Sequence, residues 1–87
     1  MPYIKKEDRP YLETLIWNLK VDIQKLNVGD LNYLITQILL STKPIRYSDY
    51  NRLIGVLECV KLEFYRRAVA LYEDEKIKEN GDVYETV

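Results

Sequence analysis

The sequence predicts an all-α protein of three helices, in which a long C-terminal helix packs in an antiparallel hairpin or small bundle. Two observations predict this class. Three stretches repeat apolar residues every three or four positions, and residues typical of helix ends bound each stretch. A chain of 87 residues has room for one domain. We expect its end segments, 1–7 and 80–87, to fray, as chain ends commonly do.

The first helix is expected from about Asp8. Pro10 falls in its first turn, where the missing N–H of proline costs no hydrogen bond. The segment Asn27-Val28-Gly29 is expected to end this helix, with Gly29 adopting a positive φ. The predicted buried face consists of Leu12, Leu15, Ile16, Leu19, Ile23 and Leu26.

The second helix is expected to begin after Asp30, because aspartate is a favoured N-cap residue. Pro44 disfavours helix in the residue before it, so the segment Ser41-Thr42-Lys43-Pro44 should end this helix. Its predicted buried residues are Leu31, Leu34, Ile35, Ile38 and Leu39.

The third helix is expected from about Tyr50 to Glu79, capped by Ser48 or Asp49 and ended by Asn80-Gly81. A helix that is apolar around most of its girth needs neighbours on more than one side. Two short helices cover one side only, so we expect a second copy of the chain to cover the rest; burial inside a monomer is the alternative. The central stripe is Leu53, Leu57, Val60, Phe64, Ala68 and Leu71, and Leu62 and Val69 lie almost opposite it.

Four residues are the candidates for this interface: Trp17, Gly55, Leu62 and Val69. Glycine inside a helix costs about 1 kcal/mol relative to alanine, and close helix packing commonly offsets that cost. This packing could lie within the hairpin or against another copy, and both are favoured over a ligand contact. We therefore expect a homo-oligomer.

Composition excludes several classes of function. The net charge is −1, and the balance between basic and acidic residues disfavours binding to duplex nucleic acid. No stretch reaches the roughly 18–20 apolar residues that span a membrane, and the first residues lack a secretory signal, so we expect a cytoplasmic protein. The sequence has no histidine and a single cysteine, Cys59, which its apolar neighbours predict to be a buried structural thiol.

Catalytic machinery is not expected, since the commonest general base and metal ligand is missing and the three glycines form no phosphate loop. The carboxylates of Glu73, Asp74 and Glu75 could bind a hard cation, but successive residues of a helix point in different directions. We expect no metal, no cofactor and no enzyme activity.

The segment Tyr65-Arg66-Arg67 is the best candidate for ligand binding. Arginine binds phosphate or carboxylate with two parallel hydrogen bonds, and tyrosine adds a stacking surface. Glu63 is placed to pair with Arg67 four residues later, which would leave Arg66 free. Tyr33 and Tyr50, near the predicted turns, could complete such a site. The alternative is a solvated helix face.

Four blocks of the sequence are 1–9 (MPYIKKEDR), 29–36 (GDLNYLIT), 50–67 (YNRLIGVLECVKLEFYRR) and 72–84 (YEDEKIKENGDVY). Together they resemble a family of short helical proteins from bacteriophages, prophages and bacteria. The resemblance spans nearly the whole chain and implies a viral or mobile-element origin. The family has no established activity, so it assigns no site residues.

Two functions are therefore expected. The first is a non-catalytic, self-assembling protein that sequesters a small anionic, nucleotide-like signal of host defence. In size and helicity the chain is similar to small phage proteins that do this, although it shares no motif with them. The alternative is a protein-interaction module that inhibits or adapts a host or phage protein.

Overall fold

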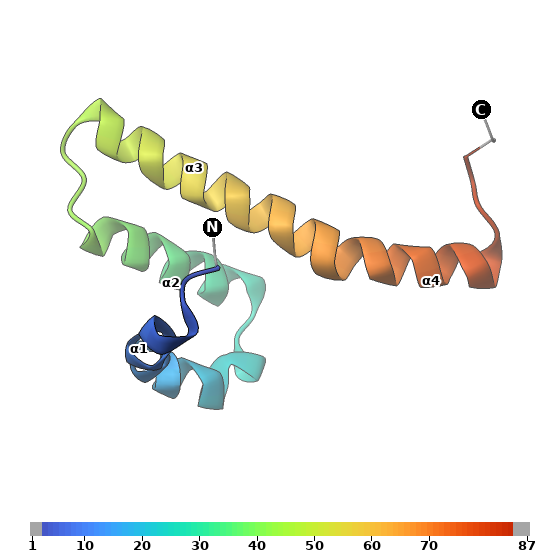
Figure 1. The fold of residues 1–87 in the computed structure, drawn as a ribbon, viewed down its shortest axis with the longest axis horizontal. Helices are drawn as coiled ribbons and strands as arrows, with labels where there is room; N and C mark the ends of the chain where they lie inside the picture. The colour runs from blue at the N-terminus through green and yellow to red at the C-terminus, as the bar shows by residue number, and fades with distance from the viewer. Residues whose placement is uncertain (1–2, 85–87) are drawn as a thin grey trace. The chain divides into compact units, whose positions relative to one another are not determined.

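The computed structural model describes residues 3–84, and within this range the chain is helical with no strand (Figure 1). The all-α class is confirmed. The α-helices are α1 (Arg9–Asp22), α2 (Val28–Ser41), α3 (Tyr47–Phe64) and α4 (Ala70–Asn80). A five-residue π-helical turn, Tyr65–Val69, joins α3 to α4 without a break, so that three helical stretches result, as predicted.

The chain divides into two compact units, Met1–Leu53 and Ile54–Val87, with the boundary inside α3. The single domain predicted from chain length stays a prediction. The predicted fraying of the end segments falls in part on residues 1–2 and 85–87, which lie outside the described residues.

The first helix begins where the sequence predicts. A 3₁₀ turn, Lys6–Asp8, leads into α1, and Pro10 lies in the first turn. The predicted helix end at Asn27-Val28-Gly29 is wrong, because α1 ends at Asp22, a second 3₁₀ turn follows it, and Leu26 has an extended backbone. Val21 and Ile23 are β-branched residues on either side of Asp22, and all three have low helix propensity.

A capping box begins α2. The Asn27 side chain accepts a hydrogen bond from the Asp30 N–H at 2.8 Å, and the Asp30 carboxylate accepts one from the Asn27 N–H at 3.1 Å. The N-cap residue is therefore Asn27, and the prediction that Asp30 is the N-cap is wrong. Gly29 lies in the first turn of α2 instead of ending α1 with a positive φ.

The loop after α2 turns at Lys43, whose φ of 55° is the left-handed conformation, and Pro44 follows it, as the predicted helix end requires. α3 begins earlier than predicted. Asp49 lies within its first turn, where the carboxylate accepts hydrogen bonds from the N–H groups of Ile45 and Arg46 at 3.1 and 3.0 Å. These two hydrogen bonds lower the pKa of Asp49.

The long helical stretch ends at Gly81, as predicted. Gly81 has a φ of 85°, and its N–H donates to the Ile77 carbonyl at 2.8 Å. A residue with a side chain rarely adopts this conformation, so glycine suits the position.

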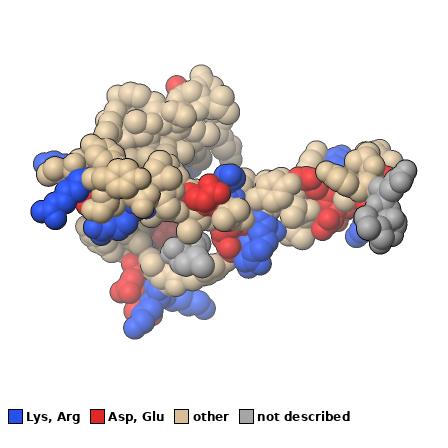
Figure 2. All heavy atoms as spheres, turned by 90° about the horizontal axis from the view of Figure 1, so that it is seen from above, with Lys and Arg blue, Asp and Glu red and all other residues tan. Residues whose placement is uncertain are grey.

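Neither unit contains a buried side chain among residues 3–84. Within residues 3–53, α1 contacts the short 3₁₀ turns on either side of it and packs broadly against no other helix. Large uncharged areas are visible on the surface (Figure 2). Most of the residues predicted to form the buried faces are exposed, and half-buried positions are Leu19, Leu26, Leu31, Leu34, Leu39, Pro44, Asp49, Leu53, Leu57, Glu63, Val69 and Ala70.

Candidate binding site at the π turn

The π turn Tyr65–Val69 contains the three residues that the sequence singled out for binding: Tyr65, Arg66 and Arg67. The N–H of Ala70 donates to the carbonyl of Tyr65, five residues earlier, instead of to the residue four earlier as in an α-helix. Such single π-helical turns are rare, and a large share of those known lie at functional sites. Nothing in the residue types of this segment predicts a π turn.

The π turn changes which residues share a face. A π-helical hydrogen bond joins residues five positions apart, one more than an α-helical hydrogen bond. The residues after the turn are therefore rotated about the helix axis by one position, about 100°, relative to a regular α-helix. In a regular α-helix, Tyr65 and Glu73 would lie about 80° apart. With the extra residue they lie on one line, and the Tyr65 hydroxyl donates a hydrogen bond to Glu73 Oε1 at 2.6 Å.

This hydrogen bond raises the pKa of Tyr65, because the Glu73 carboxylate holds the phenol proton and its negative charge opposes ionisation of the phenol. Tyr65 nevertheless remains half exposed. Its ring face is open to stacking, whereas its hydroxyl already has a partner.

The ion pairing of the two arginines differs from the prediction. Arg66, not Arg67, pairs with Glu63, with 2.8 Å between Nη2 and Oε1. The ion pair therefore spans three positions, as do the Asp49–Arg52 and Glu58–Lys61 pairs of α3. Within the part of the chain that the structure describes, Arg67 forms no ion pair, so of the two arginines in the π turn it is the more available to a ligand.

The remaining predicted ligand residues, Tyr33 in α2 and Tyr50 in α3, belong to the first unit and are exposed. The other three candidate residues share the π turn of the second unit. A single site containing all five stays a prediction.

Three of the four predicted interface residues, Trp17, Gly55 and Leu62, are exposed. Trp17 is 68% exposed and Leu62 58% exposed, whereas Val69 is half-buried in the π turn. At Gly55, an added Cβ would meet no described atom within 4 Å. The cost of this glycine is therefore not explained by packing among residues 3–84.

Cys59 is exposed, so the prediction of a buried structural thiol is wrong. The residue lies two positions after the half-buried Leu57, which places it about 200° further round the helix. The apolar residues that do share its face, Val56 and Leu62, are themselves exposed and therefore do not bury it.

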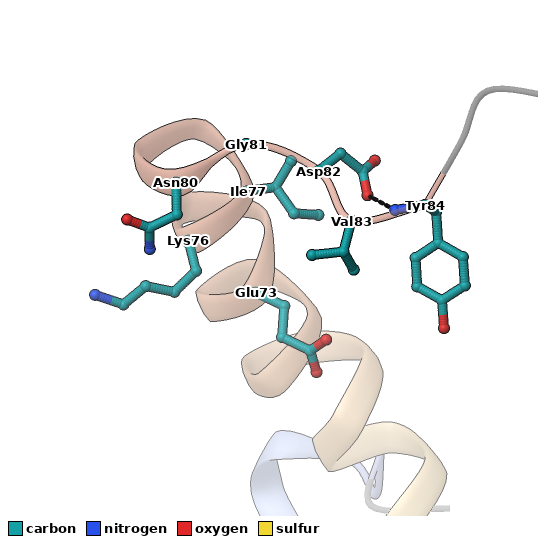
Figure 3. A pocket seen from close by; sticks show the side chains of 8 residues that line it. All are labelled: Glu73, Lys76, Ile77, Asn80, Gly81, Asp82, Val83 and Tyr84. Atoms are coloured by element: carbon teal, nitrogen blue, oxygen red, sulfur yellow. Dashed lines mark hydrogen bonds between the residues drawn. The ribbon is translucent and has the colours of Figure 1, made fainter.

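A shallow hollow of about 280 Å³, which sequence reasoning missed, lies where the chain turns back after α4 (Figure 3). Ile77 and Val83 form its apolar side, and Tyr84 flanks it (Figure 3). The Lys76 ammonium is engaged elsewhere, paired with Glu79 at 3.1 Å and lying 5.5 Å from the centre of the Tyr72 ring. With carboxylates on Glu73 and Asp82, the hollow does not suit an anion. The turn signal Asn80-Gly81-Asp82 was its only trace in the sequence.

No group of three or more acidic, cysteine or histidine side chains suited to a metal ion occurs in the described range. Among its helices, none is both long and apolar enough to cross a lipid bilayer.

Comparison with known protein families assigns the chain to one of them. Residues 1–83 match the model of a family described as a domain of unknown function (DUF6899). The chain belongs to this family. No curated protein and no solved structure matches the chain significantly. Membership of the DUF6899 family agrees with the resemblance drawn from the four sequence blocks, while an origin in a bacteriophage stays a prediction.

Proposed function

We propose that this DUF6899 protein is a self-assembling, non-catalytic binding protein whose hydrophobic core is completed by further copies of the chain. The observation that carries the proposal is the lack of any buried side chain among residues 3–84. Ordering one residue costs about 1–2 kcal/mol of backbone conformational entropy, and burial of apolar side chains is the main term that offsets it.

The intrinsic stability of the helices does not offset this entropy cost. α1 and α2 each have 14 residues, and isolated helices of about 12–15 residues are marginal in water. Burial of one Leu, Ile, Val or Phe side chain contributes roughly 1.5–3 kcal/mol. Contact with another copy supplies this burial, because each helix exposes several such side chains.

A concentration series tests the proposal. Native mass spectrometry and sedimentation should show an oligomer, and dilution should lower the helical circular dichroism as the subunits separate. Full helicity in a strictly monomeric protein at every concentration would show that the chain needs no partner copy.

A matched pair of variants tests the predicted interface. Leu62→Asp places a charge on an exposed apolar position and should weaken association. Asn51→Asp adds the same charge at an exposed polar position of α3 and should not. Equal association of both variants would exclude Leu62 from the contact.

We propose that the assembled protein captures a small anionic, nucleotide-like ligand through Arg67, with the Tyr65 ring stacking on a base. In a phage-encoded protein of the host cytoplasm, such capture would sequester a defence signal. Cyclic dinucleotides and ADP-ribose derivatives should raise the melting temperature of the protein, and Arg67→Ala should abolish the shift. Arg46→Ala, an exposed arginine of the first unit, is the control. Lack of any shift in the unmodified protein would exclude these ligands.

Trp17 supports the second candidate, a protein-interaction module acting on a host or phage protein. Tryptophan is enriched at the energetic centres of protein interfaces, and Trp17 is largely exposed. A host protein retained in stoichiometric amount by the unmodified chain, and lost with Trp17→Ala, would favour this function. Retention of self-copies alone would count against it.

A further inference from the structure

A line of apolar residues crosses the π turn in the second unit. Phe64 and Tyr72 lie eight positions apart on opposite sides of the turn. The extra residue in the turn places them on one face, for the same reason that it aligns Tyr65 with Glu73. Phe64 is 65% and Tyr72 63% exposed, and the small residue Ala68 lies midway between them.

The apolar stripe predicted from the sequence and the face seen in the structure differ after Ala68. With α-helical spacing throughout, Leu71 continues the stripe after Ala68. The π turn moves Leu71 about 100° away and puts Tyr72 in its place. The face that crosses the turn therefore has an aromatic side chain at each end and a small residue at its centre.

Charge divides at the same centre. Residues 61–67, before Ala68, contain three basic residues and one acidic residue, a net charge of +2. Residues 69–75, after it, contain three acidic residues and no basic residue, a net charge of −3. The charged residues are Lys61, Glu63, Arg66 and Arg67 before the centre and Glu73, Asp74 and Glu75 after it. Lys61, Arg67, Glu73 and Glu75 flank the face, whereas Arg66 and Asp74 lie two positions from it, on the opposite side of the helix.

We propose that this face pairs with the same face of a second copy in antiparallel orientation, about a two-fold axis at Ala68. The inference rests on the proposed self-assembly and specifies its contact. Antiparallel pairing opposes the basic half of one helix to the acidic half of the other, whereas parallel pairing opposes like charges. Ala68 allows the helices to approach closely, and Phe64 of each copy meets Tyr72 of the other in an aromatic pair.

Three variants test the orientation. Lys61→Glu with Arg67→Glu makes both halves acidic, and Glu73→Lys with Glu75→Lys makes both halves basic. Each variant should self-associate about tenfold more weakly or worse, because complementary charge becomes repulsive. A variant carrying all four changes exchanges the two charges and should recover association. The four positions are exposed, and circular dichroism at high concentration checks that the helices persist.

Native mass spectrometry and sedimentation over a dilution series give the readout, with Lys43→Glu and Arg46→Glu together as the control for a change of two charges in the first unit. Weakening by each pair and recovery in the four-residue variant support the antiparallel contact. Unchanged association of the two variants indicates a parallel contact or another face and overturns it, while the proposed self-assembly stands. A weakened pair without recovery also overturns it. A monomeric, fully helical unmodified protein overturns both proposals.

Discussion

Substituting alanine for two glycines in the same helical stretch separates backbone strain from packing. An added Cβ meets no described atom within 4 Å at Gly55 or at Gly81, so neither change introduces a clash. Gly55 lies inside α3, where alanine is favoured over glycine by about 0.8–1 kcal/mol. Gly81 has φ 85° and ψ 150°, a conformation almost confined to glycine, which costs other residues about 1–3 kcal/mol.

We therefore expect Gly55→Ala to raise the free energy of unfolding by about 1 kcal/mol and Gly81→Ala to lower it by about 1–3 kcal/mol. For a domain of this size, 1 kcal/mol corresponds to roughly 4–8 °C in melting temperature. Urea and thermal unfolding followed by circular dichroism measure both variants. The protein concentration must be held constant, because association contributes to apparent stability.

A decrease in stability with Gly55→Ala would refute this reasoning. It would mean that the space around Gly55 is filled in solution, and that another copy approaches the helix there, as the sequence predicts. A neutral Gly81→Ala would show that the turn after α4 changes conformation at little cost.

Three more predictions concern single side chains. Asn27→Ala should destabilise the protein by about 0.5–2 kcal/mol through loss of the capping box, whereas Asn18→Ala, at an exposed position inside α1, should not, as measured by urea unfolding. The Tyr65 pKa is raised, so the stability contributed by its hydrogen bond is present below the ordinary tyrosine value of 10.0 and is lost as the pH rises through the Tyr65 pKa. In a tyrosinate absorbance titration, Glu73→Gln should shift one tyrosine to lower pH, and superimposable curves would contradict this. Cys59 should react with a thiol reagent without denaturant, and protection at high protein concentration alone would place Cys59 in an interface.

Helix positions were predictable because the signals for them are local. Proline at the start of α1 and glycine after α4 act through their own backbone conformations, and both were located correctly. The start of α2 was not, because both Asn27 and Asp30 are good capping residues. Both residues take part in one reciprocal capping box, so the prediction of a single capping residue missed half of it.

Arrangement around the helix was less predictable, because it depends on a hydrogen-bond pattern that no residue type specifies. Regular α-helical spacing pairs Glu63 with Arg67 and continues the apolar stripe through Leu71. The pair that forms is Glu63–Arg66 instead, and the extra residue in the π turn brings Tyr72 to the stripe in place of Leu71. The segment chosen for binding coincides with the π turn, although it was chosen for its charge and aromatic character, and its role in binding stays a prediction.

Because Trp17 is exposed, its fluorescence can report association of the protein. The sequence contains one tryptophan, so all indole fluorescence comes from one position in α1. An indole in water emits at longer wavelength than one shielded by protein. A shift of the emission to shorter wavelength on concentration would therefore reveal contact at α1 without any label, and a constant spectrum in an associating sample would locate the contact on other helices.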